Sequence, residues 1–216
     1  MSFQTIFNIQ QSMSVNNRRT VGEQVSRGGQ IRTAGYLTAV PWVFTVMPHN
    51  YLYYPQVRDV IQSIDVSDRE YPQNITFNTT QLSWFTDYKG GLSLAQAAAL
   101  TLASVPAANA TIISVGNLPV IGSTTVVFAA GDFLQLGTYV YKVAATVLRG
   151  AGSTVSVTLH RPVIGTPATG TLAAVGASVY FPVYAEQCPT YTLTPMTSGA
   201  FVAWDGPFVF RENIAP

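Results

Sequence analysis

Charged residues are scarce in this sequence, at 10% of 216 residues, where about 25% is usual for globular proteins. The 11 basic and 10 acidic side chains leave a formal net charge of +1. This balance provides no electrostatic basis for binding nucleic acid, a membrane surface or an acidic substrate. Because charged groups usually keep a free protein soluble, the composition favours a chain that other subunits cover. A compact β protein rich in Thr and Ser is the alternative, since it also stays soluble.

Cysteine and long apolar runs are scarce as well. Cys188 is the only cysteine, so no internal disulfide or cysteine-based metal site can form, and we expect a buried or half-buried free thiol. Residues 1–5 lack the basic and apolar regions of a signal peptide. The longest apolar-leaning region, residues 92–130, is broken by proline, glycine and asparagine and predicts no transmembrane helix. We therefore expect a protein without a membrane partner, made in a cytoplasm and soluble or assembled there.

Catalytic patterns are weak. His49 and His160 are the only histidines and have no metal-ligand spacing to one another or to cysteine. There is no G-x-S-x-G elbow, and no glycine-rich phosphate loop opens a helix. Paired carboxylates can serve glycoside chemistry or Ca²⁺, but after a helix they are more often solvated or salt-bridged. This applies to the cluster Asp65, Asp68, Arg69 and Glu70. We predict no catalytic residue, no metal, no cofactor and no enzymatic activity.

What the sequence does contain is β structure, most clearly in residues 131–160 (GDFLQLGTYVYKVAATVLRGAGSTVSVTLH). Apolar residues alternate from Phe133 to Ala144, which puts Tyr139, Tyr141 and Val143 on one face of a strand. A second alternating run covers 155–160, and the glycine-rich segment 149–153 between them is typical of a turn. The pattern predicts a β-hairpin.

Further strands and one clear helix are predicted elsewhere. Residues 55–65 repeat apolar side chains at i, i+3, i+4 and i+7, the stripe of an amphipathic helix, while the alanine-rich segment 92–103 is a weaker helix candidate. The Asp205-Gly206-Pro207 turn separates two strands within 200–212. The other predicted strands are 39–48, 75–78, 82–86, 111–115, 124–128, 178–184 and 190–194.

Residues 1–35 are polar and predict an N-terminal arm. A short edge strand is conceivable at residues 3–9, and residues 21–30 are typical of an extended arm or long loop. Four arginines oppose one glutamate in this arm: Arg18, Arg19, Arg27 and Arg32. The arm is either a solvated loop or an interface in which these arginines bind carboxylates of a neighbouring subunit.

A change in composition suggests two domains. No charged residue occurs between Lys89 and Asp132, and aromatic strands return near Tyr180. We expect residues 1–90 and 183–216 to form one mainly β domain with the helix packed on its sheet. Residues 91–182 are expected to form a second domain, a small β-barrel.

The order of several short motifs resembles tail-hub and distal-tail proteins of the baseplate or tail tip of tailed bacteriophages, over about residues 36–212. The motifs are Pro41-Trp42-x-Phe44-Thr45-Val46 before an amphipathic helix, then Gly131-Asp132-Phe133-Leu134-Gln135-Leu136-Gly137 with Tyr139-x-Tyr141-x-Val143, then Val157-x-Leu159-x-Arg161-Pro162, then Gly206-Pro207-Phe208-Val209-Phe210-Arg211-Glu212. The resemblance implies a tube-like β-sandwich or barrel domain, split by an inserted small barrel that carries the GDF-x-Q-x-G element (Gly131, Asp132, Phe133, Gln135 and Gly137). Asp132 and Gln135 would then be structural, as a turn acceptor and a polar group of the strand.

The resemblance also implies a function. The protein would be a structural virion component that forms a ring, most readily a hexamer, near the distal end of the tail. This ring would join the tail tube to the other baseplate or tail-tip proteins and enclose a channel through which DNA passes without specific binding.

A carbohydrate-binding module that contacts host-surface glycans is the alternative function. Sugars stack on exposed aromatic rings, and the candidate rings are Tyr139, Tyr141, Tyr180 and Tyr184. The competing interpretation, which we favour, is that Tyr139 and Tyr141 fill the core of the barrel with their hydroxyls at its rim.

Overall fold

The computed structural model describes residues 3–18, 21–25, 31–35, 40–66 and 71–214. The chain is mainly β, as the sequence predicts. Packing divides it into two compact units. Unit 1 comprises Met1–Asn17, Pro41–Gln81 and Tyr180–Pro216, and unit 2 comprises Arg18–Val40 and Leu82–Val179. The expected boundaries at 90/91 and 182/183 thus fall at 81/82 and 179/180, with residues 18–40 grouped into unit 2 as well.

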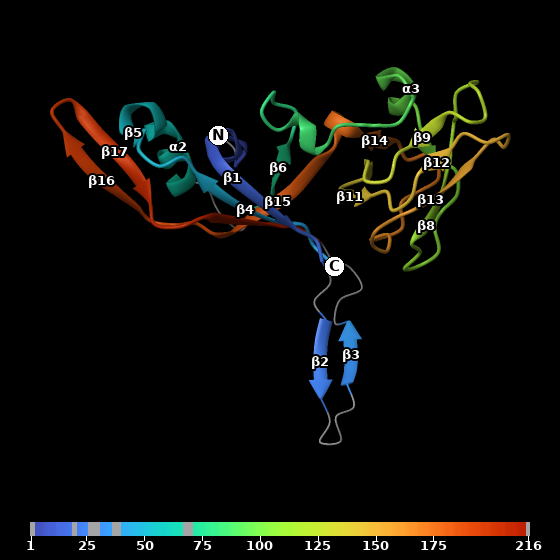
Figure 1. Ribbon diagram of the computed structural model, residues 1–216, viewed down its shortest axis with the longest axis horizontal. Helices are drawn as coiled ribbons and strands as arrows, with labels where there is room; N and C mark the ends of the chain where they lie inside the picture. Colours follow the sequence, from blue (N-terminus) through green and yellow to red (C-terminus); the bar gives the residue numbers. More distant parts are fainter. Residues whose placement is uncertain (1–2, 19–20, 26–30, 36–39, 67–70, 215–216) are drawn as a thin grey trace. The chain divides into compact units, whose positions relative to one another are not determined.

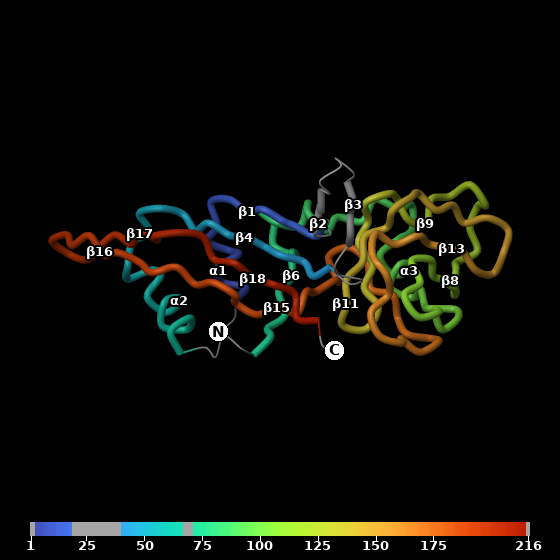
Figure 2. The backbone as a smooth tube through the Cα atoms, turned by 90° about the horizontal axis from the view of Figure 1, so that it is seen from below, coloured from blue at the N-terminus to red at the C-terminus, as the bar shows by residue number. Residues whose placement is uncertain are grey.

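The centre of unit 1 is a five-stranded antiparallel sheet with the order β1-β4-β18-β15-β6 (Figure 2). Its strands come from two parts of the chain, residues 10–76 and residues 180–212. They are β1 (Gln10–Asn16), β4 (Val43–Pro48), β18 (Phe208–Glu212), β15 (Tyr180–Gln187) and β6 (Gln73–Thr76).

One face of this sheet holds an aromatic core. Trp42, Phe44 and Val46 are buried there, which confirms the alternation that the sequence shows. The short helix α1 (Gln4–Asn8) covers it and inserts Phe7, whose ring centroid lies 6.0 Å from that of Phe44 and 5.1 Å from that of Phe210. Aromatic pairs at such separations are favourable beyond the area they bury.

The prediction for the first residues of the chain was therefore wrong. Residues 3–9 were a candidate edge strand within a polar arm, but they form α1 and bury Phe3, Ile6 and Phe7. These apolar residues lie at i, i+3 and i+4, the helical spacing. β1 then joins the sheet beside β4, so the arm begins only after Asn16.

A second, three-stranded sheet of unit 1 supports the predicted amphipathic helix. Strand β17 (Gly199–Trp204) pairs with β16 (Tyr191–Met196) and β5 (Leu52–Tyr53). Helix α2 (Tyr54–Val66) lies beside β5 and β17 and buries Val57, Val60 and Ile61, which confirms the helix expected over 55–65 (Figure 1).

Residues 21–25 and 31–35 are not a loop. β2 (Val21–Val25) pairs antiparallel with β3 (Ile31–Gly35), so each strand satisfies backbone groups of the other. We call these two strands the ribbon. It lies in the chain between β1 and β4, which pair with one another as well.

Besides the ribbon, unit 2 contains three small antiparallel sheets. A one-turn helix, α3 (Leu94–Ala98), begins at a capping box formed by Ser93 and Gln96 and is shorter than the predicted segment 92–103, because Thr101 and Leu102 pair as a strand. Two 3-10 helices, η1 (Ser83–Phe85) and η2 (Gly176–Ser178), complete the unit; η1 replaces a predicted strand. The sheets are β11 (Tyr139–Lys142), β10 (Phe133–Leu136) and β14 (Ala173–Val175); β12 (Val147–Leu148) and β9 (Val126–Phe128); and β13 (Val155–Thr158), β8 (Ile112–Gly116) and β7 (Thr101–Leu102).

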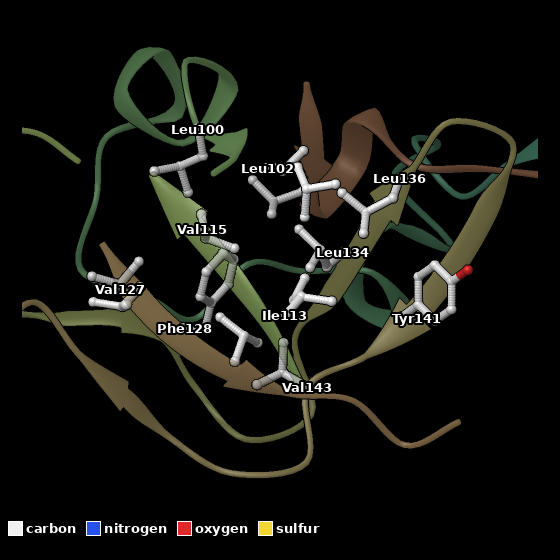
Figure 3. Packing of buried hydrophobic residues seen from close by; sticks show 14 of the residues in the cluster. Leu100, Leu102, Ile113, Val115, Val127, Phe128, Leu134, Leu136, Tyr141 and Val143 are labelled. Carbon is white, nitrogen blue, oxygen red and sulfur yellow. The ribbon is translucent and has the colours of Figure 1, made fainter. Parts of the chain in front are cut away.

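Side chains from all three sheets and from the α3–β7 segment meet in one core (Figure 3). The core is aliphatic apart from Phe128 and Tyr141, in contrast to the aromatic core of unit 1. The ring of Tyr141 lies at the margin of the cluster, with its hydroxyl directed away from it (Figure 3).

The predicted long hairpin is wrong in its pairing. Residues 133–136 turn back at once on 139–142, with Leu136 opposite Tyr139. Gly137 makes this two-residue reversal possible because its φ of 61° lies in the left-handed region that glycine adopts at little cost. β13 pairs instead with β8, and a single bridge between Val143 and Leu159 remains of the expected ladder.

Candidate functional site

The GDF-x-Q-x-G element begins with a buried carboxylate. Asp132 is 2% exposed, and its Oδ1 and Oδ2 accept hydrogen bonds from the backbone N–H groups of Lys89 (3.0 Å) and Ala129 (2.8 Å). Its own carbonyl accepts from the N–H of Val143 (2.8 Å), and Gly131 has φ 96°. Asp132 therefore fixes two loops to the start of β10, and its carboxylate oxygens are engaged in structural contacts.

The rest of the element is a central, fully buried strand. β10 lies between β11 and β14, and its four residues, Phe133 and Gln135 among them, are all buried. Gln135 is opposite Val140 on one side and Ala174 on the other. Gly137 closes the element in the tight turn. A strand enclosed in this way supports the core of unit 2 and presents none of its side chains to a ligand.

Arg161 is a buried cation that the sequence interpretation did not recognise. It is 1% exposed; its Nη1 donates to the carbonyl of Val40 (2.7 Å) and its Nη2 to the carbonyl of Val140 (2.8 Å). The guanidinium also lies over the Tyr141 ring, 5.2 Å from its centroid. The alternation Val157, Leu159, Arg161 already places this residue on the buried face, and that signal was available in the sequence.

His160 is bound to Lys142 at the end of β11. The imidazole Nδ1 of His160 accepts a hydrogen bond from the backbone N–H of Lys142 (2.8 Å), and the backbone N–H of His160 donates to the Lys142 carbonyl (2.9 Å). Burial and, secondly, the charge of Arg161 lower the pKa of His160 to about 4. The imidazole is therefore neutral at physiological pH and serves as a structural acceptor.

Tyrosine hydroxyls of unit 2 bind backbone groups. Tyr141 is fully buried and its hydroxyl accepts from the N–H of Ile164 (2.9 Å), so its ring cannot stack on a sugar. Tyr88 donates to the carbonyl of Val127, and burial raises its pKa to about 12. The other candidates for sugar stacking, Tyr139, Tyr180 and Tyr184, are half-buried.

The first and last motifs of the resemblance meet in unit 1. Glu212 is 1% exposed; its Oε2 accepts from the N–H of Trp42 (3.0 Å), and its N–H donates to the Trp42 carbonyl (2.7 Å). Next to it, Arg211 forms an ion pair with Glu186 of β15 (2.8 Å), and this pairing raises the pKa of Arg211. Residues 170 positions apart thus share one strand pair.

The other candidate residues lie apart from these contacts. Arg18 is exposed, Arg32 belongs to β3, and Arg19 and Arg27 lie outside the described residues. Asp65 is exposed near the end of α2, and the other acidic-cluster members, residues 68–70, also fall outside the described part. Cys188 is half-buried and forms no disulfide, as expected.

Two further observations concern ligands and membranes. Over the described residues, no group of three or more His, Cys, Asp or Glu side chains could hold a metal ion. No described helix is long and apolar enough to cross a membrane. In comparisons with known proteins, neither the protein-family models nor the curated proteins include a match to this chain.

Proposed function

We propose that this chain is a structural protein of a bacteriophage tail. It forms a ring at the distal end, in the baseplate or tail tip, and joins the tail tube to the adsorption apparatus. Copies of the chain, tube subunits and other tail-tip proteins are its partners, and DNA passes through the enclosed channel without specific binding.

The observation that carries the proposal is the position of the resemblance motifs in the two units. Trp42 and Glu212, from the first and last motifs, pair in the sheet of unit 1. The GDF-x-Q-x-G element is the central strand of a unit encoded between them. A split β domain with an inserted barrel is the arrangement that the resemblance implies.

The contacts of the buried polar side chains of unit 2 agree with a scaffolding role. Asp132, His160 and Arg161 all bind backbone groups, as do the hydroxyls of Tyr88 and Tyr141. Groups engaged in this way hold loops and strands in position, which supports a scaffolding role.

Electron cryomicroscopy of intact virions tests the proposal. We expect a ring of this chain below the last tube subunits, with sixfold symmetry as the first expectation. Mass spectrometry of purified virions provides an independent measurement. Virions that contain no copy of the protein, or copies confined to the capsid, would refute the proposal.

A further inference from the structure

Strand β1 presents an unprotected edge. It lies along one border of the five-stranded sheet and, in the described part of the chain, pairs with β4 alone (Figure 2). Among the described residues, no strand pairs with its other side over the segment Gln11–Val15, so the backbone groups there can accept another strand. Such an edge is a template for pairing with another chain.

Proteins usually protect edges with charged residues or proline, and β1 contains neither. The opposite border of the same sheet is protected. There the amide side chain of Gln4 binds the backbone of Thr76, accepting from its N–H (2.7 Å) and donating to its carbonyl (2.9 Å). The edge strand β16 of the second sheet contains Pro195, which lacks an N–H. β1 therefore differs from both of these edges, β6 and β16.

The side chains of β1 also fit a second copy of β1. In an antiparallel pair, directly opposite residues lie on the same face of the sheet. When the two strands are copies related by a two-fold axis, this condition is met only if the axis passes through one residue, which then lies opposite the same residue of the second copy. With Ser14 on the axis, Met13 meets Val15 of the second copy and Ser12 meets Asn16. Half-buried apolar side chains then meet apolar ones, polar side chains meet polar ones, and no like charges oppose each other. Centring on Met13 instead would put Gln11 opposite Val15.

We propose that β1 pairs antiparallel with β1 of a second copy, centred on Ser14, and joins two sheets into one. The contact concerns the free protein in solution and does not rest on the proposed tail function. Because a two-fold contact uses the same edge of both copies and Gln4 covers the opposite border, the joined sheet stops growing at two copies.

A register-specific disulfide tests this arrangement. In the full-length chain with Cys188→Ser, Ser14→Cys places two thiols directly opposite each other, within the range of Cα distances that a disulfide bridges. Ser12→Cys is the matched control, because two copies of residue 12 would lie about 13 Å apart along the strands. Under mild oxidation we expect a covalent dimer from Ser14→Cys and little from Ser12→Cys. Equal cross-linking of both variants, or none of Ser14→Cys, would overturn the proposal.

Sedimentation provides a second measurement without cysteine. Ser14→Lys places like charges opposite each other and should raise the dimer dissociation constant about tenfold or more. Thr192→Lys adds the same charge to an exposed position of β16 and should leave that constant unchanged. A wild-type chain that sediments as a monomer throughout the micromolar range, or equal effects of the two lysines, would show that β1 is not the contact.

Discussion

His160 makes the stability of unit 2 depend on pH. Its pKa of about 4 in the folded state lies below the usual value of 6.5, so between pH 6.5 and 4 the unfolded chain takes up a proton that the folded chain does not. As the pH is lowered from 6.5 to 4, the free energy of unfolding should therefore decrease, by up to about 1.4 kcal/mol per pH unit. Above pH 6.5 the stabilisation that comes from the neutral imidazole is fully present.

The variant His160→Asn isolates this effect from that of the carboxylates. Asparagine retains an acceptor for the Lys142 N–H but does not titrate. Denaturant unfolding at several pH values should show the wild-type advantage shrinking from pH 6.5 to 4. Parallel stability curves for the two proteins would contradict the assignment.

Gly90 is required because of a tyrosine. A Cβ at this position would lie 2.2 Å from the Tyr88 hydroxyl and 2.5 Å from the Val127 carbonyl, and the carbonyl belongs to the backbone. Gly90→Ala should therefore destabilise unit 2 by about 2–3 kcal/mol through overpacking. At Gly122 the nearest atom, Thr125 Oγ1, would be 3.6 Å away, so Gly122→Ala should cost less than about 0.5 kcal/mol. Chemical denaturation compares the two, and equal losses would be inconsistent with the steric argument.

Asp132 is predicted to contribute through its two hydrogen bonds. Asp132→Ala leaves the buried N–H groups of Lys89 and Ala129 without their acceptor, which should cost about 2–4 kcal/mol. Asp132→Asn keeps one acceptor oxygen and should lose less. The order wild type, Asn, Ala in unfolding free energy is the expected result; an alanine variant as stable as wild type would rule this role out.

Among the elements, the ribbon can be removed separately. Its strands pair with each other, whereas α1 belongs to the aromatic core of unit 1 and β1 to its five-stranded sheet. Replacing residues 21–35 by a short Gly-Ser link should leave a folded protein, by near-ultraviolet circular dichroism. On the proposed tail function, this protein should not be incorporated into virions. Deleting residues 2–30 should instead abolish folding, because Phe7 is lost from the core. Normal incorporation of the ribbon-deleted chain would refute a role of the ribbon in assembly.

How far the elements could be predicted depended on local signals. Helix α2 was predictable because its apolar stripe runs over about two turns, and β4 because its alternation is regular. Helix α1 has only five residues, too few to show a helical repeat of apolar side chains, and its helical state depends on packing against Phe44 and Phe210. The turn at Gly137 divides the strand that was expected over residues 133–144 into β10 and β11, which pair with each other. β13 pairs with β8 instead.

In the candidate site, too, only the features with a local signal in the sequence could be predicted. The position of Arg161 on the buried face could be inferred from the alternation. The carbonyls of Val40 and Val140 that accept its hydrogen bonds, however, come from distant segments. Likewise, Asp132 was predictable as a turn acceptor for a nearby N–H, while its bond to Lys89 spans 43 positions. Contacts between segments far apart depend on topology, which periodicity alone does not determine.

At the scale of the whole molecule, the two units have separate cores, one aromatic and one aliphatic. Chains with more than one core commonly depart from two-state unfolding. We therefore predict two calorimetric transitions. Gly90→Ala should lower the midpoint of one, and Gly199→Ala the midpoint of the other, because a Cβ at Gly199 would lie 2.6 Å from the Tyr53 ring in unit 1. For a loss of about 2 kcal/mol each shift should be several degrees. A single transition that both substitutions lower equally would show that the units unfold as one.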